Sequence, residues 1–312
     1  MKIAAFTEGG YSGPVPRNHP NMRTDLAWWC ALEAIHHPLQ HLPSIGDNEY
    51  DLGIVIIPKK REHLIQVDLI EQLKRVCKKV ATMQESTYYY WQDDPLQEQI
   101  WYYNILMEMD IIFCHNEDDL KYYRGITGKR CELMPTLMIE DNIKVSDNKT
   151  ETVMIGGNFV SAYGGFDSYL VAKEISEEVW APTTGRMKEE EKQMEINHLP
   201  WVFWNDWIHE LSKHKYGVQL GTAAAGTFNL NCAYLGIPCI GYRNVNTQIK
   251  CHPELTVNVG DIEKARKLAN KLKTDKDFYQ KCSNGARKKY KECFGENVYI
   301  YNMKKVIEEV MS

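Results

Sequence analysis

The sequence predicts an α/β protein built from two Rossmann-like domains. Short apolar runs of strand length alternate with segments of helical spacing along most of the 312-residue chain. A strand followed by two glycines occurs twice, at residues 2–10 and again at residues 152–157. Between these halves, residues 140–151 are polar and have no hydrophobic period, as expected of a linker.

In the first half, strands and helices are expected to alternate. A loop rich in glycine and proline, residues 8–20, follows the first strand. Thr24 can cap the next helix, and Asn116 can cap a later helix whose first turn is acidic. The expected strands are 2–7, 51–57, 79–83, 109–116 and 129–135, and the expected helices are 23–36, 68–77, 97–107 and 117–123.

The second half repeats this alternation. Gly236 is expected to end one helix, and Asp261 is expected to cap another. Residues 188–194 form a charged loop or helix. Residues 196–200 form a short strand or a loop. The expected strands are 152–155, 179–182, 216–220, 238–242 and 254–259, and the expected helices are 168–175, 204–214, 227–235, 261–272, 276–294 and 298–311.

Composition excludes several classes of protein. The chain is 44% hydrophobic and 25% charged, which is ordinary for a soluble globular protein. Its apolar runs are far shorter than the roughly 20 residues that cross a bilayer, so neither a signal peptide nor a membrane span is expected. Nine cysteines without a C-x-x-C pair indicate reduced thiols and a cytoplasmic protein.

Charge and histidine spacing give weaker signals. The net charge of −5 does not favour nucleic-acid binding, although residues 264–291 are locally basic. Such lysines usually belong to solvated helix faces. His36, His37 and His41 lack the spacing of zinc ligands, and they are interpreted as a surface cluster near a loop. No metal site is therefore expected.

The segment 216–242 is the most informative about a ligand. Gly221, three alanines and Gly226 separate an apolar strand from a helix that begins near Thr227. These small residues allow close approach to the backbone, so the first amides of the helix could face an anion at the positive end of the helix dipole. A turn of this composition also occurs in parallel α/β proteins for packing alone.

The order of parts in this segment resembles the donor-binding βαβ unit of GT-B glycosyltransferases. There, an apolar strand, a loop of small residues and a helix are followed by G-x-P and another strand; here the G-x-P is Gly236-Ile237-Pro238. The first half also ends as GT-B first domains commonly do, with a strand, a capped helix, a strand and the proline of Met134-Pro135-Thr136.

The resemblance covers nearly the whole chain and implies a domain organisation. It predicts two Rossmann-like domains that face one another across a cleft, with the C-terminal helix crossing back to the first domain. Residues 1–140 would form the acceptor domain and 141–151 the linker. Residues 152–294 would form the nucleotide-sugar domain, and residues 295–312 the terminal helix.

The resemblance also implies residues that bind the donor. Leu199 and Trp201 would border the nucleobase, although simple core packing explains Trp201 equally well. A cation, Arg186 or Arg243, would stabilise the leaving diphosphate. The diphosphate itself would be held by backbone and side-chain groups of Asn158, Gly226, Thr227, Phe228 and Asn229.

One departure from the family pattern points to the reaction class. Retaining GT-B enzymes of the glycogen-synthase-like clan carry two glutamates spaced E-x7-E, and Ala223 and Asn231 stand at those positions here. Their absence favours an inverting mechanism with one general base on the acceptor side. Asp25 is the first candidate for this base and His19 the second, while Glu33 is a third; Asp25 could instead be only a helix-capping acid.

Further residues of the first half are assigned to the acceptor side. Arg17 and Arg23 could bind an anionic acceptor, and Gly9 and Gly10 would leave room for it. His115 and Asn116, at the end of a strand, are expected to point into the cleft.

The sequence thus predicts a metal-independent glycosyltransferase without a cofactor. It would move a sugar from a nucleotide-diphosphate sugar, such as a UDP-sugar, to an unidentified small-molecule or glycan acceptor. Hydroxymethylated pyrimidines in DNA are an alternative acceptor, since some viral DNA glucosyltransferases are GT-B proteins of comparable size. A nucleotide-sugar epimerase and a non-catalytic nucleotide-sugar-binding protein remain as further alternatives.

Overall fold

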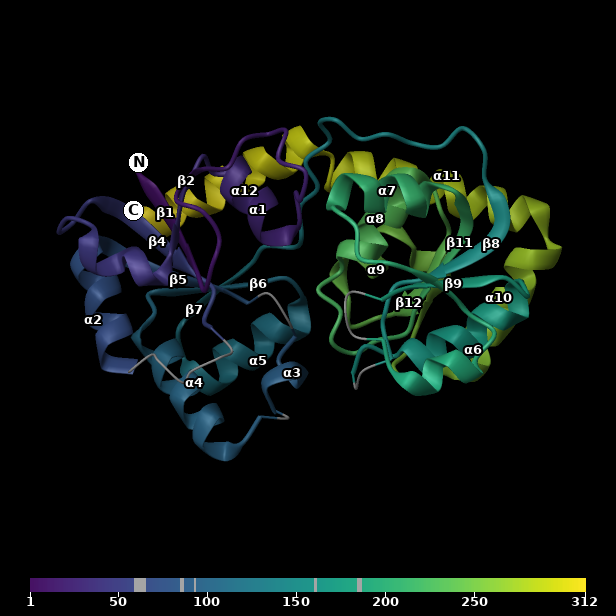
Figure 1. Ribbon diagram of the computed structural model, residues 1–312, viewed down its shortest axis with the longest axis horizontal. Coiled ribbons are helices and arrows are strands. Elements are labelled where there is room, and N and C mark those ends of the chain that lie inside the picture. Colours follow the sequence, from purple (N-terminus) through teal and green to yellow (C-terminus); the bar gives the residue numbers. More distant parts are fainter. Residues whose placement is uncertain (59–65, 85–86, 93, 160–161, 184–186) are drawn as a thin grey trace. The chain divides into compact units, whose positions relative to one another are not determined.

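The computed structural model divides the chain into two compact units (Figure 1). It describes residues 1–58, 66–84, 87–92, 94–159, 162–183 and 187–312. Unit 1 comprises Met1–His19, Thr24–Met134 and Tyr299–Ser312, and unit 2 comprises Pro20–Arg23 and Pro135–Val298.

Unit 1 is built on a seven-stranded sheet, counted over the described residues, in the order β2-β3-β1-β4-β5-β6-β7. All neighbouring strands are parallel except β2 and β3. The strands are β1 Ile3–Thr7, β2 Gly13–Pro14, β3 Ile35–Pro38, β4 Tyr50–Val55, β5 Cys77–Gln84, β6 Ile111–Cys114 and β7 Arg130–Leu133.

Helices cover this sheet and bury its apolar side chains. Phe6 and Ile112 of the strands pack in one core cluster with Leu73, Ile105 and Tyr123 from the helices. The helical elements of the unit are α1 Thr24–Ala31, η1 Leu39–Ser44, α2 Gln66–Val76, α3 Tyr89–Gln92, α4 Leu96–Glu108, α5 Glu117–Thr127 and the greater part of α12 Glu296–Met311.

The terminal helix α12 joins unit 1 by direct contacts. The Lys79 ammonium donates to the Val310 carbonyl at 2.8 Å, and Lys304 forms an ion pair with Glu33 at 3.1 Å. Residues 299–312 therefore belong to the unit formed by the first half of the chain. The predicted return of this helix to the first domain is confirmed.

Unit 2 is built on an entirely parallel sheet of six strands within the described residues, in the order β10-β9-β8-β11-β12-β13. The strands are β8 Thr150–Ile155, β9 Val179–Pro182, β10 Asn197–Leu199, β11 His214–Gln219, β12 Cys239–Tyr242 and β13 Thr256–Val257. The helical elements are α6 Gly165–Ile175, η2 Glu189–Gln193, α7 Trp204–Ser212, α8 Thr227–Leu235, α9 Asn246–Cys251, η3 Pro253–Leu255, α10 Ile262–Thr274 and α11 Lys276–Cys293.

The helices of unit 2 form two layers. Helices α6 and α10 pack together on one face of the sheet, while α7, α8 and α11 cover the other (Figure 1). Because both faces are covered, the central strands bury apolar side chains on both sides, with Val153, Val218 and Ile240 fully buried. The predicted α/β class with two Rossmann-like domains is confirmed.

One predicted helix was too long. Helix α1 ends at Ala31, and Glu33 adopts a left-handed conformation with φ 53°, which turns the chain into β3. In β3, His36 and His37 pair with Ala5 and Phe6 of β1. The interpretation of these histidines as a surface cluster was wrong, because His36 is only 2% exposed.

Helix α8 begins and ends where the sequence predicts. It runs from Thr227 to Leu235, and Gly236 follows as a left-handed cap with φ 63°. A Cβ added at Gly236 would collide with the Arg287 side chain, which donates from Nη2 to the Leu235 carbonyl at 3.0 Å. Glycine is therefore required both by the backbone conformation and by the contact.

Replacing Gly236 by alanine should lower the stability of unit 2 by about 1–2 kcal/mol, because of the left-handed conformation and the displaced Arg287. The measurement is the midpoint of unfolding in denaturant. Gly285→Ala is a matched control, since Gly285 lies inside α11 and an added Cβ there meets no atom within 4 Å. It should raise stability by about 0.5–1 kcal/mol. Equal effects of the two substitutions would contradict this account.

Candidate functional site

The topology of unit 2 places a candidate site beside β8 and β11. From β8 the chain continues to β9 and β10 on one side, and then returns to β11, β12 and β13 on the other. The loops that follow β8 and β11 therefore diverge from one another at a topological switch point, where open α/β sheets bind ligands. The described residues of these loops are 156–159 and 162–164 after β8, and 220–226 after β11.

Glycines bring these two loops into close contact. A Cβ on Gly221 would lie 2.5 Å from the Tyr163 carbonyl oxygen, and one on Gly164 would overlap the Leu220 carbonyl. The Leu220 amide donates to Ser168 Oγ at 2.8 Å, which ties the second loop to α6. These small residues are therefore needed for packing of the two loops against each other. This requirement does not exclude a second role in ligand binding.

The first turn of α8 begins at the end of the second loop. Gly226 precedes the helix with φ 101°, and the Leu230 amide makes the first intrahelical bond, to the Gly226 carbonyl at 3.0 Å. The amides of the three residues between them have no helical carbonyl as partner, which is general for the start of an α-helix. The positive end of the dipole of α8 thus lies beside the switch point.

Three buried side chains hold this first turn in place: Thr247, Gln248 and His252, here called the α9 clamp. Thr247 Oγ1 donates to the Gly226 carbonyl at 2.8 Å. Gln248 Oε1 accepts from the Asn229 side-chain amide at 2.8 Å, and His252 Nε2 bonds to the Asn229 carbonyl at 3.0 Å. The sequence prediction missed α9 and this clamp, because its polar residues follow no hydrophobic period.

The predicted donor-binding side chains divide into two groups. Those of Leu199, Phe228 and Asn229 are buried, as is most of Asn158, so Phe228 and Asn229 can offer only backbone amides to a ligand. In contrast, Arg243 is exposed, and its Nη1 donates to Asn258 Oδ1 at 3.3 Å. Arg186 lies outside the described residues.

Trp201 lies on the loop after β10 and is 49% exposed. The Phe203 ring packs against it edge-to-face, with 5.1 Å between centroids, and the Arg23 guanidinium carbon lies 5.6 Å from the Trp201 ring centroid. The core-packing interpretation of Trp201 is therefore wrong. Arg23, predicted on the acceptor side, belongs with Trp201 to unit 2.

A hydrogen bond between His198 and the buried Glu191, which the sequence analysis did not single out, supports the same loop. His198 Nε2 lies 2.9 Å from Glu191 Oε2, and Glu191 Oε1 accepts from the Lys188 amide at 2.7 Å. The first contact joins η2 to β10 just before Leu199, and the second lies within η2, where it closes the first turn. This arrangement fixes the strand from which the Trp201 loop departs.

Unit 1 has its own switch point, between β1 and β4. There, Thr7 Oγ1 donates to the Gly9 carbonyl at 2.7 Å and accepts from His36 Nε2 at 2.7 Å. Gly10 has φ 108°, and a Cβ on it would lie 2.6 Å from His36 Cε1. His36 thus supports the loop after β1, and burial lowers its pKa.

The other predicted residues of unit 1 lie near this loop. Arg17 is exposed, and the His19 ring stacks on Tyr11 with 5.9 Å between centroids. Asp25 is half-buried in the first turn of α1, and its charge partly opposes the lowering of the His36 pKa by burial. Glu33 is instead exposed and paired with Lys304.

His115 and Asn116 are buried, contrary to the prediction that they point into a cleft. His115 Nδ1 donates to the Met134 carbonyl at 2.9 Å, and burial lowers the pKa of His115 to about 4. The Asn116 side-chain amide donates to Asp119 Oδ2 at 3.0 Å. Both side chains therefore brace the end of β6 and do not form a polar surface.

The described part of the chain has neither a metal-binding cluster nor a helix that could span a membrane. Within it, no three His, Cys, Asp or Glu side chains gather in a way that could hold a metal ion. No helix in these described ranges combines the length and apolarity needed to span a membrane. All nine cysteines are unpaired.

Comparison with known proteins finds similarity at the level of structure. No protein-family model matches the sequence, and no curated protein matches it either. HepE from Anabaena, solved with UDP-glucose, superposes with a TM-score of 0.71 over 99% of this chain and 100% of that chain, at 9% identity. Sucrose-phosphate synthase from Thermosynechococcus elongatus gives 0.66 over 99% of both chains, at 11% identity.

TarM from S. aureus, solved with UDP, gives a TM-score of 0.64 over 92% of this chain and 59% of that chain, at 9% identity. These solved structures have the GT-B fold. At such low identities the similarity establishes the fold. The chain therefore has the GT-B fold, as the sequence predicted.

Removing the central residue of the α9 clamp should destabilise unit 2. Gln248 Nε2 donates to the Cys239 carbonyl at 2.9 Å and to the Leu255 carbonyl at 3.2 Å, and its Oε1 accepts from the Asn229 side chain. Gln248→Leu removes all three hydrogen bonds. The expected loss is about 2–4 kcal/mol in the free energy of unfolding. Thr247→Val is the matched neighbour: it removes one bond to a carbonyl that keeps Leu230 as a donor, so about 0.5–1.5 kcal/mol should be lost. Similar losses would contradict the central role of Gln248.

Proposed function

We propose that the protein is a glycosyltransferase that moves a sugar from a UDP-sugar to a hydroxyl group of an acceptor. The observation that carries this proposal is the start of α8, which the α9 clamp holds at the switch point of unit 2. A fold shared over 99% of the chain with HepE, solved with UDP-glucose, supports the choice of ligand. Cleavage of the sugar–phosphate bond would leave UDP as the product.

The donor would be held by backbone and side-chain groups of unit 2. The first-turn amides of α8 would bind the diphosphate, and the exposed Arg243 would add a positive charge as the leaving group forms. The exposed ring of Trp201 offers a stacking surface to the base. Because the helix dipole and a guanidinium supply the charge, the proposed reaction requires no metal and no cofactor.

We place the general base on unit 1. Asp25 would accept the proton of the acceptor hydroxyl while its oxygen bonds to the anomeric carbon and the diphosphate departs, which inverts the configuration. His19 is the second candidate for this base. Arg17 and the room left by Gly9 and Gly10 would serve the acceptor on the same loop.

The alternatives have less support. Basic residues of α10 and α11 lie in ion pairs, for instance Lys267 with Glu263 and Lys281 with Glu254, so this surface is not uniformly positive as DNA binding requires. An epimerase would need a ring of carboxylates, and the sequence between β8 and α6 and the sequence between β11 and α8 contain no Asp or Glu. We therefore favour a small-molecule or glycan acceptor, and the unpaired cysteines agree with a cytoplasmic protein.

Binding of UDP tests the donor site directly. UDP, and the matching UDP-sugar, should raise the midpoint of thermal unfolding, since a ligand of the folded state stabilises it. Thr227→Asp should weaken UDP at least about tenfold, because its carboxylate meets the diphosphate at the start of α8. Calorimetric titration measures this change.

Thr227→Asn is the control, because asparagine has the shape of aspartate without its charge. This variant should bind UDP within about threefold of the parent protein. The aspartate should not lower stability, because an acid in the first turn is favourable to a helix. Equal affinity of the two variants would exclude α8 as the diphosphate site. No binding of UDP-, GDP- or TDP-sugars would refute the proposed function.

Asp25→Asn tests the proposed base. Donor turnover, measured as UDP released from the UDP-sugar with water or a glycan as acceptor, should fall about a hundredfold or more, with unchanged affinity for UDP. Asp68→Asn is the matched control, since Asp68 is also an acid in the first turn of a helix, α2. If both variants keep the parental turnover, Asp25 is only a helix-capping acid.

A further inference from the structure

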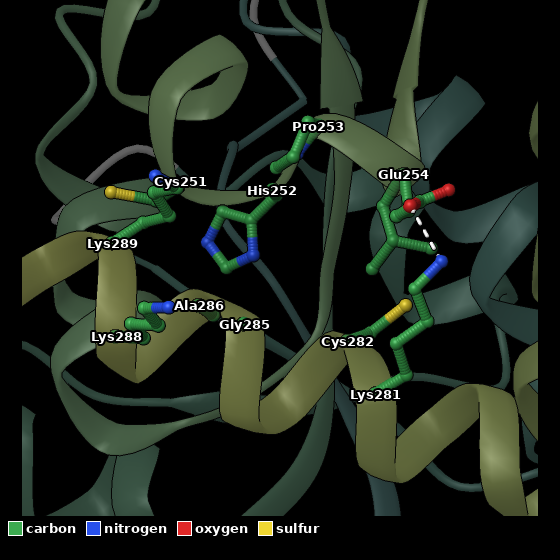
Figure 2. Close-up of a pocket in the computed structure, with 11 residues that line it drawn as sticks. Cys251, His252, Pro253, Glu254, Lys281, Cys282, Gly285, Ala286, Lys288 and Lys289 are labelled. Carbon is green, nitrogen blue, oxygen red and sulfur yellow. Dashed lines mark hydrogen bonds and ion pairs between the residues drawn. The ribbon is translucent and has the colours of Figure 1, made fainter.

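Unit 2 contains a cavity of about 170 Å³ that the proposed function does not use (Figure 2). It lies between the segment Cys251–Leu255 and helix α11. Leu255, Cys282 and Ala286 are buried in its walls, and most of its lining is apolar. An apolar cavity of about 150 Å³ holds one benzene molecule, so this space fits a single six-membered ring with a small substituent.

His252 gives the cavity one polar group of defined character. Its side chain is 3% exposed, and Nε2 bonds to the Asn229 carbonyl at 3.0 Å. A carbonyl can only accept, so Nε2 carries the proton, and burial lowers the pKa of His252 to about 4, which keeps the ring neutral. The other ring nitrogen, Nδ1, is therefore an acceptor.

This acceptor has no hydrogen-bond partner within the protein. Figure 2 shows that the Nδ1 edge of the ring is turned towards the space above α11. A buried acceptor without a partner is unfavourable, and a ligand that donates a hydrogen bond to it would remove that cost. A ligand that carries only acceptor atoms cannot donate to Nδ1 and would leave this cost in place.

Gly285 keeps the α11 side of the cavity open. It lines the cavity, and a Cβ added to it would meet no atom within 4 Å. Lys281, on the same helix, is held by its ion pair with Glu254 at 2.7 Å, as Figure 2 shows. The cavity thus combines apolar walls, an open glycine face and one neutral acceptor.

We propose that this cavity binds a small phenol-like molecule, with its ring against Leu255 and Ala286 and its hydroxyl donating to His252 Nδ1. The ring matches the volume and the apolar part of the lining, and the hydroxyl matches the acceptor that has no partner, His252 Nδ1, whereas Glu254 is already paired with Lys281. This site does not depend on the proposed function, and its test uses no nucleotide.

Fluorine NMR titration of the full chain with 4-fluorophenol and 4-fluoroanisole tests the chemistry. The two probes have similar rings, but only the phenol can donate. One molecule of 4-fluorophenol should bind, and 4-fluoroanisole should bind about three- to tenfold more weakly. Equal affinities, or no binding of the phenol, would overturn the proposal.

Gly285→Phe tests the location, because its ring can occupy the cavity. Binding of 4-fluorophenol should be lost in this variant. Gly125→Phe is the matched control: Gly125 also lies inside a helix, α5, and a Cβ there also meets no atom within 4 Å. It should bind 4-fluorophenol as the parent protein does. Retained binding in Gly285→Phe, or equal loss in both variants, would overturn the site.

Discussion

The hydrogen bond from Thr247 Oγ1 to the Gly226 carbonyl, with its neighbours in the α9 clamp, is the constraint on which the candidate donor site depends. The amides at the start of a helix bind an anion well only when the turn is fixed before the ligand arrives. Gly226 has a left-handed conformation. Glycine can adopt this conformation at little cost, but without a side chain it does not hold the backbone there. The clamp supplies the restraint from a segment about 20 residues further along the chain, so the geometry of the loop is set by tertiary contact and not by its own sequence.

In unit 1 the loop at the switch point is held by the same kinds of hydrogen bond as in unit 2. At its switch point, Thr7 Oγ1 donates to the Gly9 carbonyl, as Thr247 does to Gly226. A buried histidine is the second partner in each unit, His36 bonding to Thr7 and His252 bonding to the Asn229 carbonyl. Glycine allows the tight loop in each unit. The threonine hydroxyl and the histidine ring then restrict the conformations that glycine would otherwise allow. Each parallel sheet thus presents a preformed loop at its carboxyl edge.

The sequence predicted those parts of this arrangement that are encoded locally. Helix α8 has its own small-residue entry and its own glycine stop, so its bounds were correct to the residue. Strand β3 was missed because its four residues, with two histidines, form a strand only by pairing with β1. The α9 clamp was missed because Thr247 and Gln248 are buried against backbone groups rather than apolar side chains, which leaves no hydrophobic period to read. Burial of His115 likewise depends on the distant Met134 carbonyl.

Ala223 and Asn231 stand where retaining GT-B enzymes carry the two glutamates of the E-x7-E pattern, and their surroundings explain why neutral residues fit there. Ala223 is buried, and its amide donates to the Ala162 carbonyl at 3.0 Å, where a longer acidic side chain would need both space and a cationic partner. Asn231 is also buried; in the amide orientation that satisfies both neighbours, its side-chain oxygen accepts from Trp207 Nε1 at 3.2 Å and its nitrogen donates to the Thr227 carbonyl at 3.2 Å. A carboxylate there could not donate to Thr227, and it would carry an unpaired charge in the interior. The loop and α8 are therefore packed for neutral residues at both positions, and no carboxylate fits at either without a change in the surrounding contacts.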